Sequence, residues 1–304
     1  MTNAIEMREL TKTYGRSRGI KRISLAVEEG DIFGYLGPNG AGKSTSIRCL
    51  LGMLHATSGE AYVLGYQVGR QQKEILKRVG YVPAESYLYP SMRAGDVIRY
   101  AARMRGLDCS GEAERLCRRL EVDRRKRIGE LSYGNRKKIS IVCALQHKPE
   151  LLILDEPTSG LDPLMQEVFF ELLAERGKEG ATCFLSSHVL QEVKRCCRHV
   201  GILKEGELVK ADKVENLIGT NLRKVKLSGV RKVPSVAGMG EIVREGEYIA
   251  FPFRGEMGAL LQALQGLEIK DMLVSEPSLE EVFMHFYINE KQEGQEYGSG
   301  MAGI

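Results

Sequence analysis

The chain has 304 residues, of which 43% are hydrophobic and 28% charged, and its formal net charge is +4. This composition excludes a collagen-like or disordered chain and predicts a globular protein with one large domain and one smaller one. So small a positive charge does not by itself indicate nucleic-acid binding.

The sequence contains no apolar stretch near the roughly 20 residues that a membrane-spanning helix needs. Its first ten residues lack the basic region and apolar run of a secretory signal. The seven cysteines include no C-x-x-C pair, which is typical of reduced thiols inside a cell. We therefore expect a cytosolic protein that cannot cross a bilayer alone.

Residues 1–213 alternate strand-like and helical runs. Residues 5–10 (IEMREL) and 23–31 (ISLAVEEGD) flank a turn-prone stretch and predict an antiparallel subsheet. A further strand at 31–36 (DIFGYL) leads through glycines into a helix. In that helix Ile47, Leu50, Leu51 and Leu54 recur at helical spacing, which predicts one buried face.

The turn between that strand and that helix is GPNGAGKST, which fits the pattern G-x-x-x-x-G-K-[ST]. Glycines let backbone N–H groups face phosphates, and the helix N-terminus adds a positive dipole end. A lysine here reaches the β- and γ-phosphates, and the next serine can ligate Mg²⁺. The alternative, a glycine turn with an exposed lysine, does not explain the full pattern. The predicted ATP-binding residues are Gly37, Pro38, Asn39, Gly40, Ala41, Gly42, Lys43, Ser44 and Thr45.

Residues 86–145 are mostly helical in pattern and predict a helical insertion. Two apolar runs follow, at 151–155 (LLILD) and 182–188 (TCFLSSH), and both suit buried parallel strands. The helix between them is predicted to be capped by Asp162, with Pro163 in its first turn.

The first of these strands delivers Asp155 and Glu156 to its carboxyl end, where open parallel sheets bind ligands. There Asp155 can hold Mg²⁺ through water, and Glu156 can polarise an attacking water. The alternative is an exposed acidic turn after a strand. Its place beside a capped helix, in a chain that also has a phosphate-binding loop, favours the catalytic interpretation.

Beyond residue 213 no further phosphate motif occurs. Residues 214–304 predict a small α+β domain, with strands in 222–229, 247–253 and 267–275 around a helix at 258–266. It should end in a helix at 277–290 and a flexible glycine-rich tail at 294–304.

Taken together, GPNGAGKST, LSYGN at 131–135, LLILDEP, SGLD at 159–162 and the histidine of SSH resemble the ATPase subunits of ABC transporters. The resemblance covers residues from about 4 to 213. Walker A and Walker B motifs occur in many P-loop NTPases, whereas LSYGN resembles the ABC signature. The resemblance implies an α/β P-loop cassette with a parallel core sheet, an antiparallel β subdomain and a helical insertion.

The resemblance also implies a head-to-tail homodimer that holds two ATP molecules between Walker A of one subunit and the signature of the other. Ser132 and Gly134 would then meet the γ-phosphate across the interface, at a helix N-terminus. His188 matches the switch histidine that helps to hold Glu156 and the water in line. Tyr14 matches the aromatic residue that stacks on adenine. For these residues the alternatives are a helix cap, a structural histidine and a core tyrosine.

Asp162 matches the aspartate that communicates between the two sites, although helix capping alone could explain it. Two departures from the family pattern stand out. Where the family has a Mg²⁺-ligating glutamine, this chain has Ala84 followed by Glu85, which could replace it as a ligand. The signature has Tyr133 and Asn135 where glycine and glutamine are usual.

The family resemblance implies hydrolysis of ATP with Mg²⁺, a permease on a separate chain that docks near residues 87–104, and a peripheral location on the inner face of the cell membrane. SLEEVF at 278–283 resembles the tail of bacterial drug- and peptide-exporting ATPases, which favours export. The alternatives are a soluble ABC ATPase that acts on ribosomes or DNA, and a non-hydrolysing regulatory module. Glu156 argues against the second.

Nucleic-acid binding is not expected. The basic runs at 124–127 and 136–138 read as a solvated face, and the first lacks the interleaved aromatic residues that a stacking surface requires.

Overall fold

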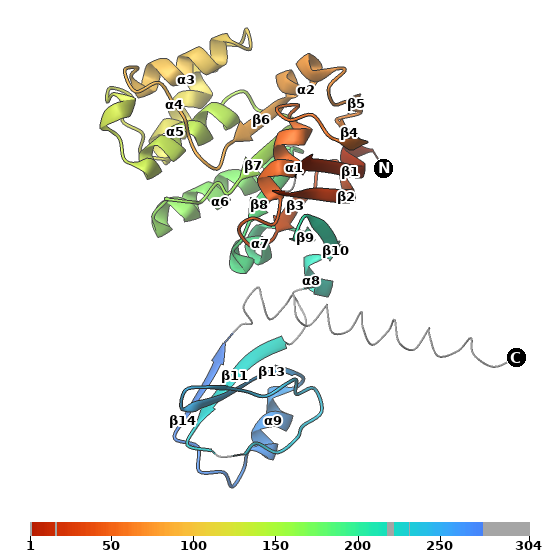
Figure 1. The fold of residues 1–304 in the computed structure, drawn as a ribbon. Coiled ribbons are helices and arrows are strands. Elements are labelled where there is room, and N and C mark those ends of the chain that lie inside the picture. The colour runs from red at the N-terminus through yellow and green to blue at the C-terminus, as the bar shows by residue number, and fades with distance from the viewer. Residues whose placement is uncertain (1, 16, 218–221, 231, 276–304) are drawn as a thin grey trace, which may run out of the picture. The chain divides into compact units, whose positions relative to one another are not determined.

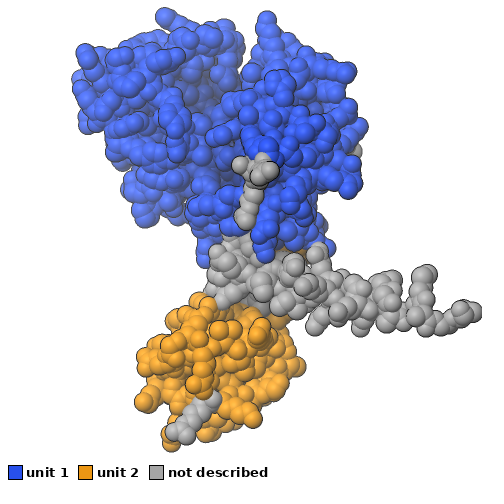
Figure 2. All heavy atoms as spheres, in the orientation of Figure 1, with its two compact units in different colours: residues 1–213 blue, residues 214–304 orange. Residues whose placement is uncertain are grey.

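The computed structural model describes residues 2–15, 17–217, 222–230 and 232–275 (Figure 1). It contains two compact units, Met1–Lys213 and Val214–Ile304, which Figure 2 draws in different colours. The helix and tail expected at 277–290 and 294–304, and the SLEEVF motif, lie outside the described residues.

The first unit begins with a four-stranded antiparallel sheet in the order β2-β1-β4-β5. Its strands are β1 (Asn3–Tyr14), β2 (Ser17–Glu28), β4 (Ser58–Val63) and β5 (Tyr66–Gln67). The antiparallel pair expected from the sequence is confirmed. Both strands extend further than their apolar runs, because pairing continues from Asn3 opposite Glu28 to Tyr14 opposite Ser17.

The second sheet has the order β10-β9-β3-β8-β7-β6, and all its neighbours are parallel except β10 against β9. The strands are β3 (Ile32–Leu36), β6 (Val79–Val82), β7 (Leu151–Asp155), β8 (Thr182–Ser187), β9 (His199–Lys204) and β10 (Glu207–Lys213). Side chains of β3, β7 and β8 are buried throughout, which is typical of a parallel sheet covered on both faces.

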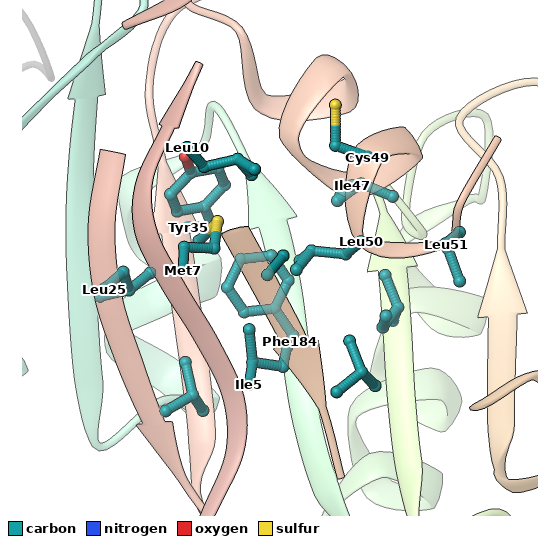
Figure 3. Close-up of a cluster of buried hydrophobic side chains, with 14 of the residues drawn as sticks. Ile5, Met7, Leu10, Leu25, Tyr35, Ile47, Cys49, Leu50, Leu51 and Phe184 are labelled. Carbon is teal, nitrogen blue, oxygen red and sulfur yellow. The ribbon is translucent and has the colours of Figure 1, made fainter. Parts of the chain in front are cut away.

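The main hydrophobic core of the first unit lies between the two sheets and helix α1 (Lys43–Leu50). Figure 3 shows Met7 and Leu10 from β1 facing Leu50 of α1 and Phe184 of β8. The rings of Tyr35 and Phe184 have centroids 5.0 Å apart. Because both β3 and α1 pack into this core, the turn that joins them is anchored at both of its ends.

Helix α1 ends earlier than its apolar spacing predicts. Leu51 is already the C-cap, and Gly52 adopts a φ of +65°, a left-handed conformation that commonly terminates helices. The prediction that Leu54 belongs to the helix is therefore wrong, although Leu54 still packs against the core.

The remaining helices of this unit are α2 (Gln72–Arg78), α3 (Ala94–Arg103), α4 (Ser110–Arg119), the 3₁₀ helix η1 (Ile128–Glu130), α5 (Tyr133–Leu145), α6 (Pro163–Lys178) and α7 (Leu190–Cys196). Four of them, from α3 to α5, lie between β6 and β7 in the chain and form the expected helical insertion (Figure 1). Within the described ranges, no helix is long and apolar enough to cross a membrane.

The second unit contains a short helix, α8 (Val214–Leu217), and a four-stranded antiparallel sheet in the order β12-β13-β11-β14. The strands are β11 (Leu222–Ser228), β12 (Val243–Glu245), β13 (Tyr248–Arg254) and β14 (Asp271–Ser275). Helix α9 (Met257–Ala263) packs on one face through Leu260, against Phe251 and Phe253. The expected α+β fold is confirmed, and β12 is an additional strand.

Candidate functional site

The turn between β3 and α1 is built so that glycine is required at two positions. A side chain at Gly37 would place its Cβ 2.4 Å from the carbonyl oxygen of Leu203, and Gly42 has a φ of +107°. The backbone N–H of Gly37 donates to the carbonyl of Ser187 at 3.1 Å, which ties the turn to the end of β8. The turn is therefore a rigid loop that leads into the N-terminus of α1.

A cavity of about 280 Å³ lies over this loop. Its walls are Gly19, Asn39, Gly40, Ala41, Gly42, Lys43, Ser44, Thr45 and Glu156. Most of the wall is thus the predicted phosphate-binding loop and the first turn of α1. Backbone N–H groups at a helix N-terminus together with a lysine suit the binding of phosphates.

Lys43 is buried, with 5% of its side chain exposed. Its Nζ donates to the carbonyls of Gly37 at 2.7 Å and Pro38 at 3.1 Å, and it lies 3.3 Å from Oε1 of Glu156. An ammonium held in this way at the start of a helix is a suitable partner for an anion. The loop therefore fits the phosphates of a nucleotide.

Glu156 lies between the lysine and the predicted switch histidine. Its Oε1 is 3.3 Å from Nδ1 of His188 as well as 3.3 Å from Nζ of Lys43. Only 22% of the glutamate side chain is exposed. The structure thus brings Lys43, Glu156 and His188 together, although they are widely separated in the sequence, and the first two line the cavity.

The backbone at Glu156 adopts a φ of +45°, a left-handed conformation that is uncommon for a residue other than glycine. Its N–H donates to the carbonyl of Ser186 at 3.2 Å and to its Oγ at 3.1 Å. Residues in such conformations cluster at active sites and persist where surrounding bonds hold them. Here Ser186 holds the backbone of Glu156, whose side chain lines the cavity.

Asp155 is almost fully buried at the end of β7, paired with Ser186 of β8. Its Oδ1 accepts a hydrogen bond of 2.6 Å from the hydroxyl of Ser186. Asp155 and Glu156 are therefore not an exposed acidic turn.

Residues that the sequence analysis did not single out support this arrangement. Glu192 of α7 accepts hydrogen bonds from Ser187, at 2.5 Å, and from Thr158, at 2.6 Å. It thereby ties the segment before His188 to the segment after Glu156. Glu192 belongs to no sequence motif. A single glutamate in a predicted helix is ordinarily a surface residue, so the sequence alone does not indicate its role.

The predicted signature segment forms the N-terminus of α5. Ser132 is the N-cap, and its hydroxyl accepts from the N–H of Asn135 at 3.3 Å. A side chain at Gly134 would place its Cβ 2.2 Å from the carbonyl oxygen of Gly160. Ser132 and Gly134 are not among the residues that line the cavity beside Lys43.

Two further predicted residues also lie apart from the cavity walls. Asp162 caps α6, since its Oδ1 accepts from the N–H of Met165 at 3.0 Å. Tyr14 is 40% exposed at the end of β1, with Nζ of Lys12 at 5.4 Å from its ring centroid. The capping role of Asp162 is as expected, and the ring of Tyr14 is accessible to a ligand.

Glu85 is exposed, and its carboxylate accepts a hydrogen bond from the hydroxyl of Tyr87. Like the signature, it does not line the cavity. Its expected role as a metal ligand beside Ser44 and Asp155 stays a prediction.

Lys137 lies beneath the segment that follows β6. It is fully buried, and its Nζ donates to the carbonyls of Pro83 at 2.7 Å and Ala84 at 2.8 Å. Burial lowers the pKa of Lys137 to about 8, against the opposing effect of the carboxylates of Asp155 and Glu156.

The interpretation of residues 136–138 as a solvated face is therefore wrong for Lys137 and for Lys138, which is also buried. The basic run at 124–127 is exposed, as expected.

We predict that Lys137 makes the stability of the protein depend on alkaline pH. In the unfolded chain its pKa is about 10.4, so between pH 8 and pH 10 the unfolded state binds more protons than the folded state. The free energy of unfolding of the parent, relative to a Lys137→Met variant, should therefore rise by about 2 kcal/mol from pH 7 to pH 9.5. Denaturant titrations of both proteins at both pH values measure this. An unchanged or decreasing difference would contradict it.

Comparisons with known proteins identify the family of this chain. Residues 20–159 match the family model described as ABC transporter. The bacitracin transport ATP-binding protein of Bacillus licheniformis is 32% identical over 297 residues, which cover 93% of this chain and 97% of that protein. The Nod factor export ATP-binding protein I of Cupriavidus metallidurans is also 32% identical, over 93% of this chain and 97% of its own length.

Among solved structures, a bacterial ABC transporter cassette described as dimeric superposes with a TM-score of 0.64 at 24% sequence identity. The match covers 69% of this chain and 98% of that one. At this identity the likeness concerns the fold, and it confirms the expected P-loop cassette with its antiparallel subsheet and helical insertion.

The family inferred from the motifs is thus confirmed by the family model and by two relatives that each match 93% of the chain. One of these relatives is named for export. The protein belongs to the ABC transporter family, as an ATP-binding subunit with an ATPase cassette.

Proposed function

We propose that this chain is the motor of an exporter, in which two copies close on two ATP molecules and move the helices of a permease on a separate chain. The observation that supports a shared site is that the predicted residues form two groups at different places in the chain's fold. Lys43 and Glu156 line one cavity and His188 contacts Glu156, whereas Ser132 and Gly134 lie at the N-terminus of α5 and do not line the cavity. A second copy would supply that helix N-terminus to the γ-phosphate.

ATP supplies a γ-phosphoryl group whose transfer to water releases the energy of the cycle. In our proposal the loop at 37–45 holds the phosphates, and Tyr14 stacks on the base. Lys43 balances the phosphate charge, Glu156 accepts a proton from the attacking water, and His188 keeps the carboxylate of Glu156 in place. Their spacing of 3.3 Å on either side of Glu156 supports these roles.

Mg²⁺ would be held by Ser44 and, through water, by Asp155. Hydroxyl and carboxylate oxygens are the ligands this ion prefers, and it usually completes its shell with water and substrate phosphates. In our proposal Glu85 could join them only after leaving Tyr87.

The permease is proposed to dock over the segment between β6 and α3 and along α3. Exposed apolar side chains gather there: Tyr87 is 88%, Tyr89 70%, Tyr100 53% and Met104 68% exposed. Apolar side chains this exposed commonly mark interaction surfaces. Docking of this kind would keep the protein at the inner face of the cell membrane.

We also propose that residues 1–213 form the ATPase cassette, with the helical subdomain at 86–145, and that residues 214–304 are an accessory domain that strengthens dimerisation. Every proposed nucleotide contact lies before residue 213. A chain that ends at residue 213 should therefore bind ATP with unchanged affinity per subunit but dimerise more weakly, as gel filtration with ATP would show. Equal dimerisation of the two chains would refute the accessory role.

The test of the transporter proposal is a tagged pull-down of the Glu156→Gln variant from gently solubilised native cells with ATP present. Blocked hydrolysis should hold the closed complex together, so a polytopic membrane protein should be recovered. The same variant with ADP, and Glu150→Gln with ATP, are the controls. Recovery of ribosomal or DNA-associated proteins without a membrane partner would contradict the proposal.

A further inference from the structure

One face of α5 holds the segment that follows β6. Tyr133, Lys137 and Ser140 recur at helical spacing, so they lie on the same side of the helix. The hydroxyl of Tyr133 donates to the carbonyl of Ala84 at 2.7 Å, and Ser140 bonds the hydroxyl of Ser86 at 2.7 Å. With the two bonds from Lys137 to the carbonyls in 83–84, residues 83–86 are fastened to α5 along its length.

Tyr133 differs from the other two because it also contacts the turn that precedes α6. A Cβ at Gly160 would lie 2.3 Å from Cδ1 and 2.5 Å from Cε1 of the tyrosine ring. The ring therefore packs directly on the backbone of Gly160, which has a φ of +77°. The next residue of the helix, Gly134, approaches the carbonyl of Gly160 equally closely.

The two departures from the family pattern are thus in contact with each other. Ala84 offers a backbone carbonyl in place of a long amide side chain, and Tyr133 offers the hydroxyl that binds it. Ser132, directly before this tyrosine, is the residue proposed to meet the partner's γ-phosphate. Asp162, two residues after Gly160, caps the helix that follows.

We infer that Tyr133 is a positioning residue that joins the signature, residues 83–86 and the Gly160 turn into one unit, through its hydroxyl on one side and its ring on the other. This inference rests on the proposed function, in which the signature acts on the nucleotide of the partner. Tyr133 would carry a displacement of residues 83–86, beside the proposed permease surface, to Ser132 and Gly134. It does not touch the nucleotide of its own chain.

Two substitutions separate the contacts. Tyr133→Phe removes the bond to Ala84 and keeps the ring on Gly160, whereas Tyr133→Ala removes both. The matched control is Tyr62→Phe, because the hydroxyl of Tyr62 likewise donates to one acceptor, Glu60 at 2.8 Å, on β4. Amide hydrogen exchange in the nucleotide-free full chain then reports on peptides 81–88 and 157–163.

The Phe variant should speed exchange in 81–88 by about two- to ten-fold, as expected for one lost hydrogen bond, and leave 157–163 unchanged. The Ala variant should speed exchange in both peptides, and Tyr62→Phe in neither. On a Glu156→Gln background, both Tyr133 variants should raise the dissociation constant of the ATP-bound dimer by about two-fold or more. ATP affinity of the monomer should stay within about two-fold.

Unchanged exchange in 81–88 for the Phe variant would overturn the inference, even if the parent dimerises normally. So would an equal loss of ATP affinity in the monomer, since Tyr133 would then act within its own site. If the Glu156→Gln parent does not dimerise with ATP, the proposed shared site fails instead, and the exchange data still decide whether Tyr133 joins the two segments. Denaturant unfolding of each variant identifies any general loss of stability.

Discussion

Replacing Glu156 with glutamine should lower ATP turnover by about 100- to 10,000-fold, the usual range for loss of a positioned general base. The amide has almost the shape of the carboxylate, so the strained backbone and its bonds to Ser186 can persist. It cannot accept the proton of the attacking water. ATP binding should be retained, because Lys43 and the loop at 37–45 are unchanged. Phosphate release and nucleotide titration measure the two quantities.

Glu150 provides the matched control for this substitution. It directly precedes β7, whereas Glu156 directly follows it, and its carboxylate pairs with Arg78 far from the cavity walls. Glu150→Gln should keep turnover within about two-fold, since exposed ion pairs contribute little. Comparable losses in both variants would show that charge in general, rather than the position of Glu156, supports hydrolysis.

Replacing Lys43 with alanine should weaken ATP binding by about 10- to 100-fold, which corresponds to one strong charge-assisted hydrogen bond. The ammonium is buried, and among the side chains that the structure describes no other lysine or arginine lines the cavity. Its removal also takes away the hydrogen bonds from Nζ to the carbonyls of Gly37 and Pro38, of which the second still accepts from the N–H of Ala41. Turnover should fall at least as much as binding. Equilibrium titration with a fluorescent ATP analogue measures the affinity.

Lys77→Ala is the control for Lys43. Lys77 also pairs with a glutamate, Glu74 at 2.9 Å, but both side chains are largely exposed on α2. Loss of such a pair costs about 0.5 kcal/mol of stability and should not affect nucleotide binding. If Lys43→Ala bound ATP as tightly as Lys77→Ala does, the loop at 37–45 would not be the phosphate site.

The phosphate loop and the acidic strand end could be predicted because each combines a fixed residue pattern with a required element order. Gly37 and Gly42 occur where close packing and a positive φ allow only glycine, and such positions leave a mark in the sequence. The buried run 151–155 likewise identifies a central strand. Glu156 could then be placed at the edge of the sheet where parallel strands end.

Other parts of the site could not be predicted, for identifiable reasons. In the sequence Lys137 has the pattern of a surface residue. It can be buried because its ammonium donates to the carbonyls of residues 83 and 84, which the sequence does not place beside it. Glu192 joins Thr158 and Ser187 through contacts that no periodicity reveals. The orientation of Glu85 toward Tyr87 depends on side-chain conformations in an exposed segment. These features depend on neighbours distant in the sequence.

The central claim, that two copies share each ATP site, is tested most directly by sedimentation velocity of Glu156→Gln with ATP, with ADP and without nucleotide. We expect a dimer with ATP only, and a Ser132→Arg substitution in the same background should abolish it while the monomer still binds ATP. A protein that stays monomeric with saturating ATP, or a dimer that the signature substitution leaves intact, would contradict the account.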